Sequence, residues 1–231
     1  MLRAQVNLSL STVLTLIRAF GLGEPHPVLE DLLSPDENEQ DARQLAYGEL
    51  GNFGLLPDGE PDPDLLHALH IISAADREYY GRITTARGGY AVLTASRNRV
   101  GALLLRDGDR VFLGPASADN LVDTLIAQLP ELHPAHGPSV TLSAHDQQDT
   151  GKLQLKELNR ILGLPRSGGG ELHAAIRDSA GRRRIAPFGL DYLDSTEGRW
   201  LHYRNVDNWI IAAPATPQLL AAKIMELANI R

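Results

Sequence analysis

The chain has 231 residues, of which 43% are hydrophobic and 22% are charged, and its formal net charge is −7 at pH 7. This composition is ordinary for a globular protein with a buried core, and the acidic balance disfavours non-specific binding to nucleic acid. The absence of cysteine excludes disulfides, thiolate metal sites and cysteine nucleophiles. We expect neither a signal peptide nor a membrane span, because no run of 18 apolar residues occurs.

The first third of the chain predicts one short strand followed by three helices. Residues 4–8 alternate in polarity like a strand, and a serine then begins a helix over residues 11–20. A Ser-Pro pair followed by an acidic residue begins a second helix over residues 34–54. An Asp-Pro pair begins a third helix over residues 62–72.

From residue 78 the apolar pattern changes to a period of two, with turns at Gly88-Gly89 and Asp107-Gly108. This pattern predicts an antiparallel meander. Residues 118–129 predict a helix, because leucines recur there at a spacing of four. Residues 130–138 are rich in proline and lack periodicity, which predicts a linker.

The second half of the chain repeats the pattern of the first. Residues 204–227 align with residues 106–129, with one extra residue before the second proline, and both units read as strand, proline, small capping residue and helix. The alternative is that two unrelated strand–helix units share a common cap. We expect an internal duplication, with quasi-repeats at residues 1–132 and 139–231 in a single domain of residues 1–231.

The stretch DQQDTGKLQLKEL, which begins at Asp146, resembles a calcium-binding loop with Glu157 at the bidentate position. Its third and fifth positions are Gln148 and Thr150, which lack carboxylates, and the preceding residues predict a strand instead of the helix that enters such a loop. We expect no metal ion there. We interpret the stretch as the start of a helix that buries Leu155, Leu158, Ile161 and Leu162.

Three other short motifs have plain structural interpretations. His67 and His70 are three residues apart on a predicted helix, but no third zinc ligand is evident. Residues 167–170 (SGGG) precede a strand and lack the lysine of a phosphate-binding loop, so we interpret them as a flexible loop. Residues 182–184 (RRR) are interpreted as a solvated hairpin tip. No catalytic motif stands out, and we expect neither an enzyme nor a cofactor.

Residues 198–227 (GRWLHYRNVDNWIIAAPATPQLLAAKIMEL) resemble the C-terminal signature of the EspG family, the cytosolic chaperones associated with type VII (ESX) secretion. That signature is a G-R-Y/W-L strand, a strand ending in proline, and a terminal helix rich in leucine and alanine. Residues 34–73 also resemble the family in their acidic helix start, Gly-Leu-Leu helix end and D-P-D-L-L opening of the next helix. The resemblance covers nearly the whole chain.

The resemblance implies a pseudo-two-fold α+β fold in which a central antiparallel β-sheet is flanked by two helical bundles. It also implies a cytoplasmic chaperone without enzyme activity or cofactor. The expected partner is a helical PPE protein within its PE–PPE heterodimer, whose exposed apolar tip the chaperone covers to keep it soluble.

The resemblance also indicates where the client binds. Family members use the loop between the second and third strands for much of the client contact, whereas the corresponding turn here is short. We expect Thr85, Arg87 and Tyr90 at this hairpin, with Trp200 and Tyr203 from the second meander, to contact the client, because aromatic and arginine side chains dominate interface energetics. Alternatively, Trp200 and Tyr203 are partly buried sheet residues.

Two other functions stay open from the sequence. One is a small-ligand-binding or catalytic α+β domain whose site lies in the groove between the two halves and uses His202 or Asp191. A closed pocket of desolvated titratable groups would favour that function. The other is a homodimer of the free protein, since a pseudo-symmetric chain can present a self-complementary face.

Overall fold

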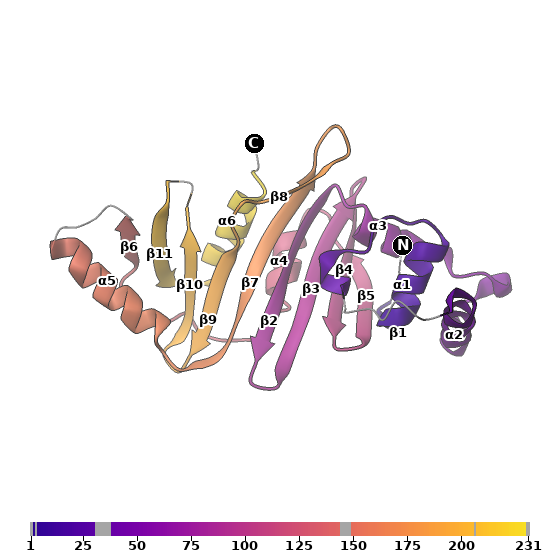
Figure 1. Cartoon of the computed structure of the whole chain (residues 1–231), viewed down its shortest axis with the longest axis horizontal. Coiled ribbons are helices and arrows are strands. Elements are labelled where there is room, and N and C mark those ends of the chain that lie inside the picture. Colours follow the sequence, from indigo (N-terminus) through magenta and orange to yellow (C-terminus); the bar gives the residue numbers. More distant parts are fainter. Residues whose placement is uncertain (1, 3, 31–37, 144–148, 206, 230–231) are drawn as a thin grey trace.

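The computed structural model describes residues 2, 4–30, 38–143, 149–205 and 207–229. In these residues the chain forms one sheet of 11 strands together with α-helices on both of its faces (Figure 1). The strands are β1 (Val6–Ser9), β2 (Arg77–Thr85), β3 (Gly88–Arg97), β4 (Val100–Asp107), β5 (Arg110–Ala116), β6 (Val140–Ser143), β7 (Arg166–Arg177), β8 (Arg183–Ile185), β9 (Leu190–Ser195), β10 (Gly198–Arg204) and β11 (Trp209–Pro214). The helices are α1 (Leu10–Ala19), η1 (Pro27–Leu29), α2 (Glu39–Asn52), η2 (Pro57–Gly59), α3 (Pro63–Ser73), α4 (Leu121–Ile126), α5 (Asp149–Leu162) and α6 (Pro217–Leu227).

The sheet joins the two halves of the chain at its centre. Its strand order is β1-β5-β4-β3-β2-β7-β9-β10-β11-β6, with β8 paired to β7 outside this path. Neighbouring strands are antiparallel throughout, and the central β2–β7 pair runs from Arg77 opposite Ile176 to Thr85 opposite Gly168. The predicted meander is therefore β2–β5, and the α+β class with a large antiparallel sheet is confirmed.

Side chains on the two sheet faces form separate cores, because successive strand residues point to opposite faces. Helices α4 and α6 pack side by side on one face, against residues such as Val92 and Leu201. On the opposite face, α1 and α3 cover Leu93 near one end, and α5 covers Trp200 near the other. Two flanking bundles are not confirmed: α1–α3 pack together at one end of the sheet, whereas α5 is the helix described at the other (Figure 1).

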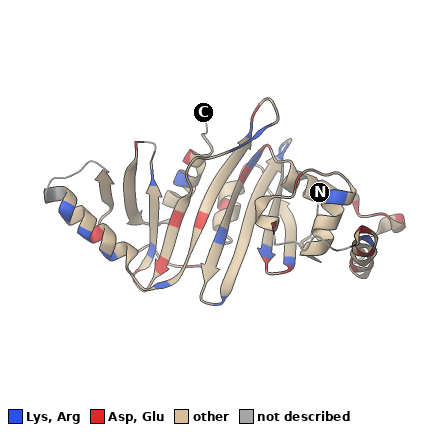
Figure 2. Cartoon of the chain, viewed as in Figure 1, with Lys and Arg blue, Asp and Glu red and all other residues tan. Residues whose placement is uncertain are grey.

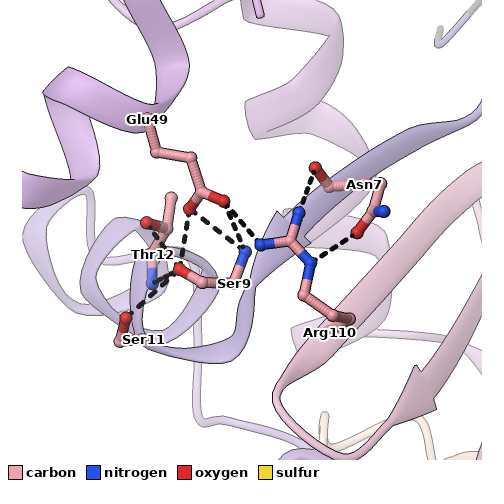
Figure 3. Close-up of polar contacts among 6 residues, drawn as sticks. All are labelled: Asn7, Ser9, Ser11, Thr12, Glu49 and Arg110. Atoms are coloured by element: carbon pink, nitrogen blue, oxygen red, sulfur yellow. Dashed lines mark hydrogen bonds and ion pairs between the residues drawn. The ribbon is translucent and has the colours of Figure 1, made fainter. Parts of the chain in front are cut away.

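A polar cluster fastens α1 and α2 to the edge strand β1 (Figure 3). Ser9 begins α1, and its side chain accepts a hydrogen bond from the backbone N–H of Thr12. Glu49 of α2 accepts hydrogen bonds from the Ser9 N–H at 3.0 Å, the Ser9 hydroxyl at 2.7 Å and Arg110 Nη1 at 2.9 Å. Burial raises the pKa of Glu49, but hydrogen bonds from Thr12, Ser9 and Arg110 outweigh it and leave the pKa lowered.

Several predicted helix starts shift in the structure. The first helix begins at Leu10, one residue before the predicted range of residues 11–20, because Ser9 and not Ser11 provides its N-terminal cap. The predicted start of the second helix at residues 34–37 lies outside the described residues, and α2 follows Asn38, whose side chain accepts from the N–H of Gln40. Helix α4 is shorter than the predicted range of residues 118–129.

The region around α5 confirms two predictions and corrects one. Strand β6 precedes α5, as predicted, although residues 146–148 of the calcium-loop-like stretch lie outside the described residues. Leu158 and Ile161 are buried in α5, but Leu155 is 46% exposed, contrary to the prediction. The predicted linker at residues 130–138 lies against β10 and contacts it through backbone hydrogen bonds.

Candidate partner-binding surface

The β2–β3 hairpin ends in an exposed turn at the lower edge of the sheet (Figure 1). Thr85 pairs with Gly88 there, and the Thr85 hydroxyl donates to the Gly88 carbonyl at 2.9 Å and accepts from the N–H of Arg87 at 3.1 Å. Gly88 has φ +135°, which favours glycine. The side chain of Arg87 is exposed, so a turn with fixed backbone geometry presents a cationic group to solvent.

The glycines expected to form a flexible loop are instead part of β7, beside this hairpin. Gly168, Gly169 and Gly170 pair with Thr85, Thr84 and Ile83 of β2. A Cβ at Gly168 would lie 2.7 Å from the Thr84 carbonyl oxygen, and one at Gly170 would lie 2.6 Å from the Tyr192 ring. The loop prediction is therefore wrong: the glycines let neighbouring backbone and the Tyr192 ring approach closely within the sheet.

Tyr90 and Tyr203 are half-buried on the face covered by α4 and α6. The Tyr90 hydroxyl donates to the carbonyl of Gln128 just after α4, and Lys223 of α6 lies 5.5 Å from the centroid of the Tyr203 ring. Both rings therefore contact helical segments of the same chain, which leaves only part of each ring available to a partner.

Trp200 is fully buried, with 0% of its surface exposed. It packs with Ile161 of α5 and Leu193 of β9, on the sheet face opposite Tyr90 and Tyr203. The structure therefore does not bring the expected contact residues together on one surface. Thr85 and Arg87 share the hairpin turn, and Trp200 belongs to a core.

One face of β2, β7, β9 and β10 carries a row of polar side chains between α3 and α5. Arg82 pairs with Glu171, Glu171 with Asp191, and Asp191 with His202, so the four side chains lie on the same face. We call these four residues the polar row. In Figure 2, acidic residues are red on β7 and β9 and basic residues are blue on β2. Asp191 Oδ2 lies 3.8 Å from His202 Nδ1, and Glu171 Oε1 lies 3.1 Å from Nε2 of His173.

His202 and Asp191 are brought together as the alternative of a ligand or catalytic site predicts, but they are not enclosed. The side chain of Asp191 is 59% exposed and that of His202 is 28% exposed. Surface hollows occur elsewhere, for example between α1 and α2, where Leu14, Arg18 and Arg43 line one of them. The polar row thus offers an accessible binding surface and lacks the desolvation expected of a catalytic pocket.

A buried ion-pair network borders the polar row. Glu78 is 3% exposed and accepts a hydrogen bond from Arg183 Nε at 2.6 Å. The Val28 N–H donates to Nδ1 of His26, so the other ring nitrogen of His26 carries its hydrogen toward Glu78 at 3.2 Å. Burial raises the pKa of Glu78, but His26 and Arg183 outweigh it and lower the pKa. The network fixes η1 and β8 to the sheet.

A second buried ion pair lies on β9 and β10, and sequence reasoning missed it. Arg199 donates to Asp194 through Nε at 2.6 Å and Nη2 at 2.8 Å, and Nη2 also reaches the Pro130 carbonyl at 2.9 Å. The guanidinium lies 4.5 Å from the centroid of the Tyr192 ring. In the sequence this pair is visible only as opposite charges flanking a hairpin turn. Its role is to hold the linker on the sheet.

The described residues contain no group of three or more His, Cys, Asp or Glu side chains placed to hold a metal ion. His70 Nδ1 lies 2.8 Å from the Leu22 carbonyl oxygen, and His67 is exposed. Within the same part of the chain, no helix has the length and apolar character needed to cross a membrane.

Comparison with known proteins places the chain in a family. The EspG family model matches residues 9–226. The fold is similar to that of the Mycobacterium tuberculosis type VII secretion system chaperone EspG5, solved in complex with the PE25–PPE41 dimer, with a TM-score of 0.75 and 12% sequence identity. That similarity covers 97% of this chain and 95% of the EspG5 chain. No curated protein matches the sequence. Because the family model spans most of its length, the chain belongs to the EspG family.

Proposed function

We propose that this chain is a cytoplasmic type VII secretion chaperone that binds a PE–PPE heterodimer and keeps it soluble until secretion. The observation that carries the proposal is the family match over residues 9–226. The similarity of the fold to EspG5, whose structure contains a PE25–PPE41 dimer, supports the choice of partner. Binding of this kind needs an accessible surface and no catalytic chemistry.

The proposed client surface combines the β2–β3 turn with the open sheet face that carries the polar row. Thr85 and Arg87 contribute from the turn, where Arg87 is free to extend toward a partner. Tyr90 and Tyr203 contribute only through the exposed part of their rings. Trp200 supports the surface from beneath, because it fills the core under α5.

Coverage of an apolar client tip requires apolar groups beside this polar face. Exposed apolar side chains occur on elements that border it: Leu155 of α5 is 46% exposed and Ile185 of β8 is 49% exposed. Such groups, set beside polar and charged residues, have the composition of an interface core with a polar rim. They support a client contact in which these apolar side chains lie beside the polar row.

We also infer that the domain arose by duplication of one strand–helix unit. Thr94 and Tyr192 occupy the same place in the β3–β4 and β9–β10 hairpins. Each belongs to the fourth residue pair from the turn, where Thr94 lies opposite Leu103 and Tyr192 lies opposite Leu201. Thr94 pairs with Tyr79 on the other side, and Tyr192 pairs with Gly170. Tyr79 of β2 therefore corresponds to Gly170 of β7. Two residues further along each strand, Gly81 corresponds to Leu172. These two residues face each other in the β2–β7 pair, as a two-fold axis at the centre of the sheet requires.

The edge strands support the same inference. Val6 of β1 lies opposite Leu113 of β5, and Val140 of β6 lies opposite Ala212 of β11. The two edge strands read VNLS and VTLS, a repeat that sequence inspection could have found. Co-expression of residues 1–132 and 139–231 as two chains should give a one-to-one complex if each half carries a complete unit. Halves that stay apart would contradict the inference.

The chaperone proposal is tested by co-expressing the chain with each PE–PPE pair encoded near it and measuring mass after size-exclusion chromatography. We expect one pair to form a one-to-one-to-one complex and to remain soluble only with this chain. The free chain, measured alone, shows whether it forms a homodimer. If every heterodimer elutes separately from the chain, the proposed function is wrong.

A matched pair of variants then tests the β2–β3 turn. Arg87→Ala should weaken the complex by about 10-fold, which corresponds to the loss of one arginine contact. Arg99→Ala removes an exposed arginine from the opposite end of β3 and should leave the affinity unchanged. Equal affinities for the two variants would remove the turn from the proposed contact.

A further inference from the structure

The polar row occupies a place that is covered by a helix in the other half of the molecule. Leu93 and Leu104 form the fifth pair from the turn of the β3–β4 hairpin, and both are 0% exposed beneath α3. Asp191 and His202 form the fifth pair from the turn of the β9–β10 hairpin. Two buried leucines of one half therefore correspond to an exposed aspartate and a partly exposed histidine in the other.

The reason for the exposure is a difference in chain length between corresponding elements. In the first half, residues 20–76 separate α1 from β2 and include α2 and α3, which pack on α1. In the second half, only residues 163–165 separate α5 from β7. The second half thus has no counterpart of α3 to lie on β9 and β10. The part of this sheet face that carries Asp191 and His202 therefore stays partly exposed beside α5, and we call it the platform.

The charges on this platform are arranged unfavourably for the isolated protein. Glu171 and Asp191 lie directly opposite each other on neighbouring strands, a placement that destabilises like charges. Each carboxylate is 59% exposed, with a histidine as its nearest described ion-pair partner. The guanidinium of Arg82 donates to the Pro27 carbonyl at 2.9 Å, which directs it toward η1. The outward surface of the row is therefore anionic at its centre.

We propose that a helix of the client lies on β9 and β10 at the place that α3 occupies in the first half, and that Asp191 and Glu171 bind a lysine or arginine on that helix. This inference rests on the proposed chaperone function and adds the charged groups by which the client is recognised. A cation between the two carboxylates relieves their repulsion, so charge complementarity gives the contact specificity. Leu155, exposed on α5 at the side of the platform, provides the adjoining apolar contact.

The first test measures the dissociation constant of the full chain for the PE–PPE heterodimer retained in the co-expression experiment. Asp191→Asn and Glu171→Gln should each weaken binding by about three- to tenfold, and Asp191→Lys by about 100-fold. Between about 50 and 500 mM salt, the wild-type affinity should fall, and that of Asp191→Asn should fall less. Glu131→Gln, which neutralises an exposed carboxylate outside the row, is the matched control and should bind as the wild type does.

The second test separates charge recognition from apolar docking. The double variant Asp191→Leu, His202→Leu places leucines where the first half has the covered pair Leu93 and Leu104. We expect it to bind at least tenfold more weakly, whereas apolar docking would make it bind more tightly. Circular dichroism and thermal unfolding check that each variant is folded. A client lysine or arginine changed to glutamate should restore binding to Asp191→Lys.

The outcomes distinguish the chaperone function from the charge-based contact at the polar row. If the wild-type chain forms no complex with any heterodimer, the chaperone function itself fails, and this inference fails with it. If the wild-type complex forms but the row variants bind with unchanged affinity, the inference is overturned and the chaperone function stands. Tighter binding by the double leucine variant would likewise overturn the charge-based contact.

Discussion

The two ends of the sheet carry the same strand order but differ in how they are covered. At the first-half end, α1, α2 and α3 pack together, and Glu49 connects α2 to β1 and β5 (Figure 3). At the second-half end, α5 packs on β6 and leaves the neighbouring sheet face open. The comparison shows that one strand order occurs with three helices packed together at one end and with the sheet face beside α5 partly exposed at the other.

The largest expected effect tests whether the second half nevertheless has a core of its own. Trp200→Ala should lower the free energy of unfolding by about 3–5 kcal/mol, because it leaves a cavity beneath α5. Urea unfolding monitored by circular dichroism measures the change. A loss below about 1 kcal/mol would mean that α5 contributes little to the fold.

A smaller effect is expected where the halves differ in side-chain size. The place of Tyr79 in the first half is taken by Gly170 in the second, where the ring of Tyr192 fills the space. Gly170→Ala should destabilise the protein by about 1–3 kcal/mol, because its Cβ would overlap this ring. The double variant Gly170→Ala, Tyr192→Phe removes only the hydroxyl and should not recover the loss, whereas Gly170→Ala, Tyr192→Leu should recover part of it.

The end of the sheet covered by α1–α3 should show a pH dependence that arises from Glu49. Because the pKa of Glu49 is lower in the folded protein than in the unfolded chain, its contribution is complete above the unfolded value and is lost as the pH falls through the folded value. Glu49→Gln should therefore cost about 1–2 kcal/mol at pH 7. The difference from wild type should shrink below about pH 4. Unfolding at pH 7 and pH 3 measures it, and a constant difference would exclude this role of Glu49.

The smallest effect is expected on the exposed side of α5. Leu155→Ala should lower the free energy of unfolding by about 0.5–1 kcal/mol, because the residue is 46% exposed and loses only part of its contacts. Leu158→Ala, three residues further in the same helix, should cost about 2–4 kcal/mol, because Leu158 is buried. Similar losses for the two variants would show that Leu155 is covered in solution, for instance by a second copy of the chain.

Local signals in the sequence predicted much of the fold. Local signals located α1, α3 and α4 to within about one turn, the Asp107-Gly108 turn located the β4–β5 hairpin, and the resemblance of the C-terminal segment identified the family. The first hairpin turns at residues 86–87, and the predicted turn residues Gly88 and Gly89 belong to β3. These signals predict structure correctly because a cap or a turn depends on residues that are close in the sequence. The V-x-L-S repeat of β1 and β6 is equally local and was available.

The errors arose where distant segments decide the outcome. The glycines at 168–170 have a loop-like composition, but β2 on one side and β9 on the other draw them into the sheet. Trp200 was expected at an interface, with burial in the sheet as the alternative, and the structure places it in the core beneath α5. Similarly, the polar row consists of single residues on four strands. Their proximity depends on the pairing register between the halves, which no local pattern encodes.

The contact between the linker and β10 has a consequence for the assembly of the two halves of the chain. Two such molecules could in principle exchange halves and form a swapped dimer, since the interface between halves is the same within and between chains. Here the Ala135 N–H donates to the Arg199 carbonyl, and the Arg199 N–H donates to the carbonyl of His133. These bonds attach residues 133–135 to the second half, and the bond from Arg199 Nη2 to the Pro130 carbonyl extends this attachment toward α4. The linker thus leaves only a short segment after α4 that can act as a hinge between the two halves.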